Sequence, residues 1–300
     1  MDNWEERLAI VILNYNGADL TITALNHIRR LSKTVKIIVI DNCSTDDSYS
    51  KLNSYCKLEN VFFIENSKNL GYAAGNNTGI RFAINNLPGV DTICIMNPDI
   101  IVDKISDFKS LYDALWSDDK LSAITAITIY NDVIRMPNDF GWKRLSRKHM
   151  FFSGTLLGKF LKTSSRYSTL KLNDLKLAYV DIIQGCFFLI KKSTAEKIGL
   201  LDENTFLYQE EAILGKKIAD AGYKEAVLTT VFIHHNHKEK EKSLVKRKNK
   251  LFDIKCFYDS RKYYIRHYSG ESKWFINVSC AFLNLDLLLK RIYIYIKYKD

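Results

Sequence analysis

Hydrophobic and polar positions alternate along the first 130 residues between short apolar runs and longer amphipathic stretches. The apolar runs are rich in β-branched residues and predict strands over 8–13, 36–40, 61–64 and 92–96. The amphipathic stretches between them predict helices over 19–31, 46–57 and 72–86. Strands that alternate with helices form βαβ units, so this half predicts an α/β fold with a Rossmann-like, mostly parallel sheet flanked by helices.

The pattern changes after residue 130. Residues 131–175 are polar, basic and aromatic without a clear period, which predicts a variable loop region. A regular pattern then returns, with strands over 186–190 and up to 233, and helices over 193–198 and 211–221. We therefore expect one α/β domain over 1–240, made of a first half at about 1–130 and a second half at about 176–240.

A basic, aromatic tail over 241–300 is expected to form a helical appendage, with helices over 251–268 and 273–298. The second helix is interrupted by polar residues such as Asp286 and Lys290, so it predicts a helix that lies on a surface and does not cross a membrane. It could lie on an anionic membrane, cover the catalytic domain or form a homodimer interface.

Net charge and cysteine usage narrow the class of partner and the cell compartment. The formal charge of +10 suits a polyanionic partner, namely nucleic acid, an anionic membrane or a phosphate-bearing substrate. The six cysteines lie far apart without a C-x-x-C pair, and residues 1–7 carry acidic residues in place of the basic run of a signal peptide. We expect a reduced, cytoplasmic compartment.

Polar residues follow the first two predicted strands, where ligands bind in open α/β sheets. Asn14 and Asn16 come after the first strand, and Asp41, Asn42 and Ser44 come after the second. Each group taken alone is also typical of turns and helix caps.

The third polar segment, 69–79, has glycines at every fourth position, which lets a helix approach a strand or a ligand closely. It also carries Asn69 and Asn77. It follows the third strand, whereas a dinucleotide fingerprint needs glycines directly after the first, where 13–17 offers only Gly17. A nicotinamide-dependent oxidoreductase is therefore disfavoured.

The fourth segment places Asn97 and Asp99 at the end of an apolar strand, on a backbone stiffened by Pro98. A carboxylate there suits Mg²⁺ or Mn²⁺ that bridges a diphosphate, although a metal-free turn has the same sequence. Further along, one of the histidines at 234–237 could complete such a metal site, and His235 is the candidate. Glu210 and Glu211 stand at a predicted helix start, where negative charge is favoured in any case.

Taken in order, these segments resemble the inverting glycosyltransferase family 2, especially its bacterial rhamnosyltransferase-like branch. The opening strand and turn correspond to 10–16, D-N-x-S-x-D to 41–46, N-x-G-x-x-x-G-N-N-x-G to 69–79 and the D-x-D motif to 97–99. The acceptor-side G-x-x-x-x-I-[RK]-[RK] segment is similar to 184–192, and G-x-[FL]-D-E-x-F-F-x-Y-x-E-D to 199–211. The resemblance covers roughly 7–237.

This resemblance implies a GT-A fold in which 1–130 binds the nucleotide-sugar and 176–240 the acceptor. Glu211 would be the catalytic base, although the family has Asp at this position, and Asp181 is its competitor. The implied site comprises Asn14, Asn16, Asp41, Asn42, Ser44, Asn69, Gly71, Asn77 and Asn97 for the nucleotide-sugar, Asp181, Gly185 and Glu210 for the acceptor, and Asp99 and His235 for Mg²⁺ or Mn²⁺.

The resemblance implies a metal-dependent inverting glycosyltransferase, with L-rhamnose from dTDP-L-rhamnose as the first expectation for the donor. UDP-hexose, UDP-N-acetylhexosamine and UDP-galactofuranose remain alternatives. The expected acceptor is a lipid-linked or growing surface polysaccharide, which places the enzyme on the inner face of the cell membrane. The rival of another class is a non-catalytic protein that binds nucleotides or anionic membranes, and no nucleic-acid partner is expected.

Overall fold

The computed structural model describes residues 3–131, 133, 141–161, 165–167, 171–235 and 247–298. The first half contains α1 (Trp4–Arg7), β1 (Leu8–Asn14), α2 (Ala18–Leu31), β2 (Lys36–Asp41), α3 (Ser48–Tyr55), β3 (Val61–Glu65), α4 (Tyr72–Asn86), β4 (Thr92–Met96), β5 (Ile100–Ile101), α5 (Ile105–Trp116) and β6 (Leu121–Tyr130). The second half contains α6 (Arg147–Phe152), β7 (Leu177–Val180), β8 (Phe187–Lys191), α7 (Lys192–Lys197), α8 (Glu210–Asp220), β9 (Lys224–His235), α9 (Arg247–His267) and α10 (Lys273–Lys297).

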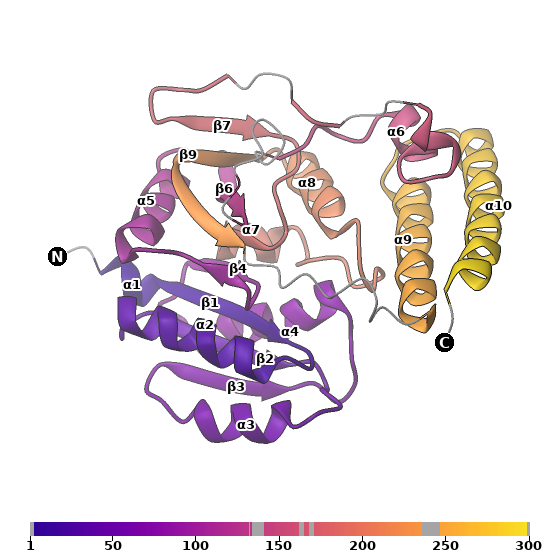
Figure 1. The fold of residues 1–300 in the computed structure, drawn as a ribbon. Helices are drawn as coiled ribbons and strands as arrows, with labels where there is room; N and C mark the ends of the chain where they lie inside the picture. The colour runs from indigo at the N-terminus through magenta and orange to yellow at the C-terminus, as the bar shows by residue number, and fades with distance from the viewer. Residues whose placement is uncertain are drawn as a thin grey trace.

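The described strands form one sheet of nine, in the order β3-β2-β1-β4-β8-β6-β9-β5 with β7 on β9 (Figure 1). Strands β1 to β4 pair in parallel, as their apolar runs predict. Successive residues of β1 point to opposite faces, so Ile10 and Ile12 enter one core while Ala9 and Val11 enter another. Helices α2, α3 and α5 pack on the first face, and α4 packs on the second.

Helix α4 lies unusually close to the sheet. A Cβ atom added to Gly75 would lie 2.8 Å from Leu13 Cδ1, and one added to Gly79 would lie 2.5 Å from Val11 Cγ1. The four-residue glycine spacing therefore serves close packing of this helix against β1.

The second half of the sheet is mixed. Strand β8 runs antiparallel to both β4 and β6, while β5 and β7 run antiparallel to β9. The sequence pattern predicted neither α5 nor the strands β5, β6 and β7. Strand β5 has two residues, which is too short to show a period, and strand direction depends on the pairing partner.

The interpretation of 131–175 as a loop region was partly wrong. Its described part contains α6 and a short 3₁₀ turn, Leu157–Lys159. Met150 of α6 is buried in a third core together with Tyr258 of α9 and Leu283 of α10. A helix of six residues is too short to show helical periodicity in the sequence, which explains the error.

Helices α9 and α10 stand side by side at one flank of the molecule, as expected for a helical appendage (Figure 1). The third core also includes Ile213 of α8, so the helix pair is packed onto the same helix that begins with Glu210 and Glu211. Within the described residues, no helix has the length and the apolar composition needed to span a bilayer.

Candidate active site

The ends of β1 and β2 form one hydrogen-bonded unit. Asn14 and Asp41 are register partners in the parallel ladder, and Asn14 Nδ2 donates to Asp41 Oδ1 over 2.8 Å. Ser44 donates to the same carboxylate through its hydroxyl, over 2.6 Å, and through its backbone N–H, over 3.0 Å. The parallel strand ends thus bring these three residues together.

The same unit extends to the neighbouring loops. The backbone N–H of Asn16 donates to Ser44 Oγ over 2.9 Å. Asn42 Nδ2 donates to Asn69 Oδ1 over 3.0 Å and to the carbonyl of Gly71 over 3.1 Å. The family residues of the first three strand ends therefore form one loop cluster.

Asp41 is completely buried, and its two oxygens accept three hydrogen bonds from Asn14 and Ser44. In this conformation it orders the loop after β2. Direct contact between Asp41 and a nucleotide base stays a prediction.

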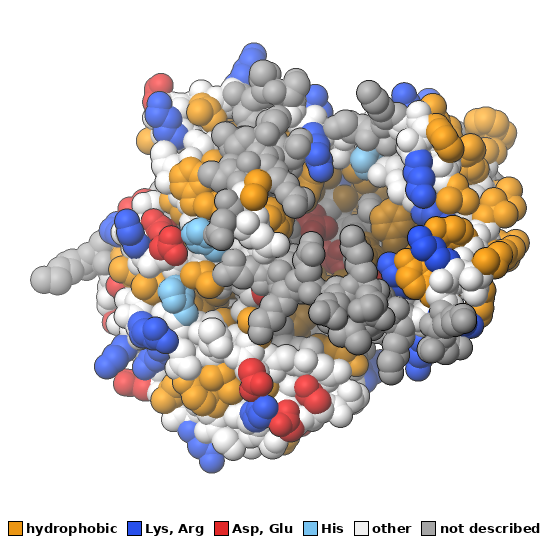
Figure 2. All heavy atoms as spheres, in the orientation of Figure 1, with side chains coloured by type: hydrophobic (Ala, Val, Ile, Leu, Met, Phe, Trp, Pro, Cys, Tyr) orange, Lys and Arg blue, Asp and Glu red, His pale blue; other side chains and the backbone are white. Residues whose placement is uncertain are grey.

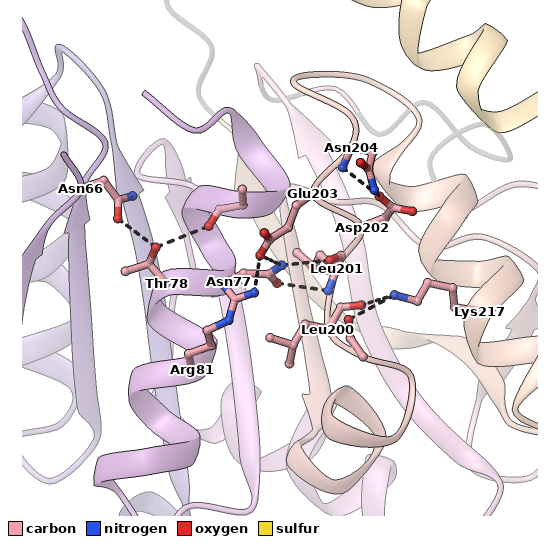
Figure 3. Close-up of polar contacts among 12 residues, drawn as sticks. Asn66, Asn77, Thr78, Arg81, Leu200, Leu201, Asp202, Glu203, Asn204 and Lys217 are labelled. Atoms are coloured by element: carbon pink, nitrogen blue, oxygen red, sulfur yellow. Dashed lines mark hydrogen bonds and ion pairs between the residues drawn. The ribbon is translucent and has the colours of Figure 1, made fainter. Parts of the chain in front are cut away.

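Gly71 and Asn77 contact the segment that precedes α8. The φ angle of Gly71 is 81°, and a Cβ atom there would lie 2.3 Å from the carbonyl oxygen of Phe206. Asn77 Nδ2 donates to the carbonyl of Leu201 and to Glu203 Oε1, and Asn77 Oδ1 accepts the N–H of Leu201 (Figure 3). The amide of Asn77 thus joins the two halves of the domain, and its proposed contact with the donor remains untested.

Asp99 and His235 face each other at the C-terminal end of β9. His235 Nε2 and Asp99 Oδ2 lie 3.1 Å apart, and the side chains are 6% and 14% exposed, respectively. Among the described residues, no group of three or more His, Cys, Asp or Glu side chains could hold a metal. One carboxylate and one imidazole are ligands that Mn²⁺ accepts, provided that a diphosphate and water supply the others. Asn97 lies in the same turn and donates its N–H to the carbonyl of Cys186 over 2.8 Å.

Glu211 lies directly over Gly185. A Cβ atom at Gly185 would lie 2.8 Å from Glu211 Oε1, so only glycine leaves room for this carboxylate. Burial raises the pKa of Glu211, although hydrogen bonds from the N–H groups of Glu211 and Gly185 act against that rise. The structure thus joins the predicted base to the predicted acceptor-side glycine.

The backbone immediately before the two glutamates is strained. Tyr208 and Gln209 have φ angles of 74° and 69°, in the left-handed region that residues with a side chain rarely adopt. Within the described residues, Gln209 Oε1 and Glu210 Oε1 are buried without hydrogen-bond partners. Burial, and then the charge of Glu211, raises the pKa of Glu210 to about 8.

Gly185 and Cys186 contact both the turn of the metal candidate and the base candidate. The carbonyl of Cys186 accepts the N–H of Asn97, and Gly185 lies against Glu211. Burial, and then the charges of Glu211 and Asp99, raises the pKa of the Cys186 thiol to about 12. The hydroxyl of Tyr72 donates to the carbonyl of Gly185, and burial is the main cause that raises the pKa of this tyrosine.

Glu211 lines a cavity of about 560 Å³, and Figure 2 shows acidic side chains inside the hollow beside α9 and α10. The other lining residues come from α6, its flanking segments, the segment after β7 and the start of α8, namely Trp142, Leu145, His149, Ser153, Ser165, Arg166, Ile182, Gln209 and Ala212. Burial and the neighbouring Arg261 lower the pKa of His149 to about 4. Sequence reasoning missed this cavity wall, because 142–166 lacks any period.

Asp181 lies apart from this cavity. Its Oδ2 accepts the N–H of Arg144 over 3.0 Å and the hydroxyl of Tyr167 over 3.2 Å. It lines a separate cavity of about 180 Å³ with Tyr167 and Glu225, which Glu211 does not line. The structure therefore separates the two residues that competed for the role of base.

Comparison with known proteins gives the family of the chain. The model of the family "Glycosyl transferase family 2" matches residues 9–199. The low-salt glycan biosynthesis hexosyltransferase Agl10 of Haloferax volcanii is 27% identical over 68% of this chain, and the poly-β-1,6-N-acetyl-D-glucosamine synthase of Staphylococcus aureus is 25% identical over 73%. The chain spans 59% and 47% of the lengths of these relatives, respectively.

The fold is shared with a solved structure, the mannosyltransferase PcManGT of Pyrobaculum calidifontis in complex with GDP-Man and Mn²⁺. It superimposes with a TM-score of 0.56 at 15% identity, covering 96% of this chain and 73% of that one. The mixed sheet and its flanking helices are thus those of a GT-A glycosyltransferase, as expected. With a family model that spans most of its catalytic domain, the chain is a glycosyltransferase and belongs to glycosyl transferase family 2.

Proposed function

We propose that the chain transfers a sugar from a nucleotide donor to a hydroxyl of a glycan acceptor, in a single displacement that inverts the anomeric carbon. The observation that carries this proposal is the placement of Glu211, a buried carboxylate that lines the 560 Å³ cavity and lies against Gly185. The next residue, Cys186, accepts the N–H of Asn97 from the turn that carries Asp99. A base close to the diphosphate site is what this displacement requires.

On the donor side, Asp99 and His235 would hold Mn²⁺ or Mg²⁺ against the diphosphate. The cation would neutralise the charge that develops on the departing nucleoside diphosphate. The loop cluster around Asn14, Asn42 and Asn69 is already hydrogen-bonded, so little conformational freedom is lost when the nucleotide binds. Asn16, Asp41, Ser44, Gly71, Asn77 and Asn97 complete the proposed donor side.

On the acceptor side, Glu211 would take the proton of the attacking hydroxyl. The hydroxyl oxygen then forms a bond to the anomeric carbon while the bond from that carbon to the diphosphate oxygen breaks, and the electron pair leaves with the diphosphate. Gly185 lets the carboxylate lie against the backbone, and a raised pKa makes Glu211 a stronger base than an exposed glutamate. Glu210 and the more distant Asp181 remain proposed acceptor residues.

The donor sugar is the finer part of the proposal. L-Rhamnose from dTDP-L-rhamnose is one candidate, on the motif resemblance alone. The names of the two relatives, a hexosyltransferase and an N-acetylglucosamine polymer synthase, favour a hexose or an N-acetylhexosamine, with UDP-galactofuranose as a further option. Both names also favour a glycan or polysaccharide acceptor, which we propose is lipid-linked.

A panel of sugar nucleotides tests the proposal. The chain is incubated with dTDP-L-rhamnose, UDP-hexoses, UDP-N-acetylhexosamines, UDP-galactofuranose and GDP-mannose, with Mn²⁺ or Mg²⁺ or neither. We expect one donor to raise the melting temperature and to be hydrolysed slowly in a metal-dependent manner. A chain that binds and hydrolyses none of them contradicts the proposed function.

We also propose that α10 docks the enzyme on the anionic cytoplasmic face of a membrane. Its outward side is apolar, with Trp274 73%, Leu288 54% and Ile296 82% exposed, and Figure 2 shows this apolar patch over α10. Within Lys273–Lys297 the acidic residue Asp286 is buried, whereas the basic residues Lys273 and Lys297 are exposed and Arg291 is partly exposed. Aromatic and apolar side chains bordered by cations suit an anionic interface.

Flotation with vesicles of phosphatidylserine and phosphatidylcholine at low salt tests this docking. We expect the intact chain to float, and the variant Leu288→Ser/Ile292→Ser/Ile296→Ser to stay at the bottom of the gradient. All three side chains are about half exposed or more, so the fold should be retained. An intact chain that ignores the vesicles and sediments as a dimer would instead assign the patch to a second copy.

A further inference from the structure

The short segment between α7 and α8, residues 201–209, leads directly into the helix start that carries Glu211. It ends in the two left-handed residues, Tyr208 and Gln209, and Glu210 and Glu211 follow at once. Each left-handed residue costs about 1–2 kcal/mol. Without external contacts, the turn would therefore relax and rotate the start of α8.

Helix α9 and Tyr268, the residue directly after it, supply hydrogen bonds to this segment. Tyr263 Oη donates to Asp202 Oδ2 over 3.0 Å, and the hydroxyl of Tyr268 donates to the same oxygen. Ser260 Oγ donates to the carbonyl of Leu207 over 2.7 Å, one residue before the left-handed turn. Burial alone would raise the pKa of Asp202, but its hydrogen bonds outweigh burial and the pKa lies below its usual value, so these bonds involve a carboxylate.

Aromatic contacts between α9 and the segment lie beside these hydrogen bonds. Phe257 meets Tyr208 edge to face with ring centroids 5.8 Å apart, and Phe252 meets Phe206 at 5.4 Å. Edge-to-face pairs at this spacing are favourable. Tyr208, the first strained residue, is therefore packed directly against α9.

The opposite side of the segment is held by the catalytic domain itself. Figure 3 shows that Asn77 of α4 donates to Leu201 and Glu203, and that Arg81 of α4 forms an ion pair with Glu203. Lys217 of α8 donates to the carbonyl of Leu200. The segment is thus fixed between α4 and α9. These α4 contacts involve Leu201 and Glu203, whereas Leu207 and Tyr208 contact α9.

We propose that α9, together with Tyr268 directly after it, is a positioning element of the active site, in which Ser260, Tyr263 and Tyr268 hold the strained turn that aims Glu211 into the cavity. This inference rests on the proposed role of Glu211 as the base. It gives the C-terminal helices a part in the chemistry that does not depend on membrane docking.

The test uses the full chain with Ser260→Ala and with Tyr263→Phe/Tyr268→Phe. The matched control is Tyr258→Phe, the same chemical change on the same helix, because the Tyr258 hydroxyl contacts Asp286 of α10 and not the 201–209 segment. With the donor that the wild type accepts in the panel, we expect kcat to fall about 10- to 10²-fold at an unchanged donor KM, since a small misplacement of a reacting group has effects of this size. The control should lower the melting temperature while kcat is retained.

Amide hydrogen exchange over 201–211 gives a readout that needs no turnover. We expect faster exchange there in both α9 variants and unchanged exchange in the control. Equal exchange and equal kcat in the α9 variants and the control would overturn the proposal. A wild-type chain that turns over no sugar nucleotide would instead refute the proposed function, and exchange alone would then decide whether α9 holds the segment.

Discussion

The loop cluster at the ends of β1 and β2 and the 201–209 segment before α8 are both polar, but they are held in different ways. In the loop cluster, Asn14, Asp41 and Ser44 bond to one another, over distances of 2.6–3.1 Å. The 201–209 segment instead depends on α4 and α9, which are distant from it in sequence. The proposed donor side is thus ordered by its own motifs, whereas we infer that tertiary contacts aim the proposed base.

Removal of the metal is the strongest test of the donor side. We expect excess EDTA to abolish sugar transfer and Asp99→Ala to do the same, because the diphosphate would leave without charge neutralisation. Isothermal titration of Mn²⁺ in the presence of nucleoside diphosphate measures the binding. Full activity in EDTA would contradict the metal proposal and shift the role to a lysine or arginine.

Glu211→Gln tests the base side. Loss of a general base lowers turnover by about 10²- to 10⁴-fold, and we expect donor affinity measured by calorimetry to stay nearly unchanged. Asp181→Asn is the matched variant, because Asp181 lines a different cavity. If Asp181→Asn lost turnover while Glu211→Gln stayed active, the base would have to be reassigned.

The difference between the two regions also explains what could be predicted from the sequence. Strands β1 to β4 and α4 follow from local periodicity, and their end loops carry motif residues at fixed spacing. Asp99, Gly185 and Glu211 were identified by motif, but the contacts of Gly185 with Glu211 and of Cys186 with Asn97 depend on the antiparallel insertion of β8 between β4 and β6. Two features left no periodic signal in the sequence, because they consist of contacts between distant residues. These are the cavity wall formed by Trp142 and α6, and the contacts of α9 with the segment before the proposed base.

Gly79→Ala tests how closely the donor half is packed. The added methyl group would lie 2.5 Å from Val11 Cγ1, in a core without spare room, so we expect a loss of about 1–3 kcal/mol in the free energy of unfolding. Greater helix propensity would offset about 1 kcal/mol of that loss. Gly89→Ala is the control, since its added Cβ meets no described atom within 4 Å. Urea denaturation of both variants measures the difference, and equal midpoints would show that α4 can move away from the sheet.

The smallest expected effect is on the pH dependence of turnover. Glu211 accepts a proton only as a carboxylate, and burial raises its pKa, so kcat should fall as the pH decreases through that raised pKa. Glu210 is a buried neighbour of like charge, and two such groups titrate together. Glu210→Gln removes that charge, so ionisation of Glu211 becomes easier and its pKa falls. The acid limb of the kcat profile should then move to lower pH, while the plateau at high pH changes little. An acid limb that stays in place would mean that burial alone sets the pKa of Glu211, and a limb that moves to higher pH would mean that Glu210 stabilises the ionised base.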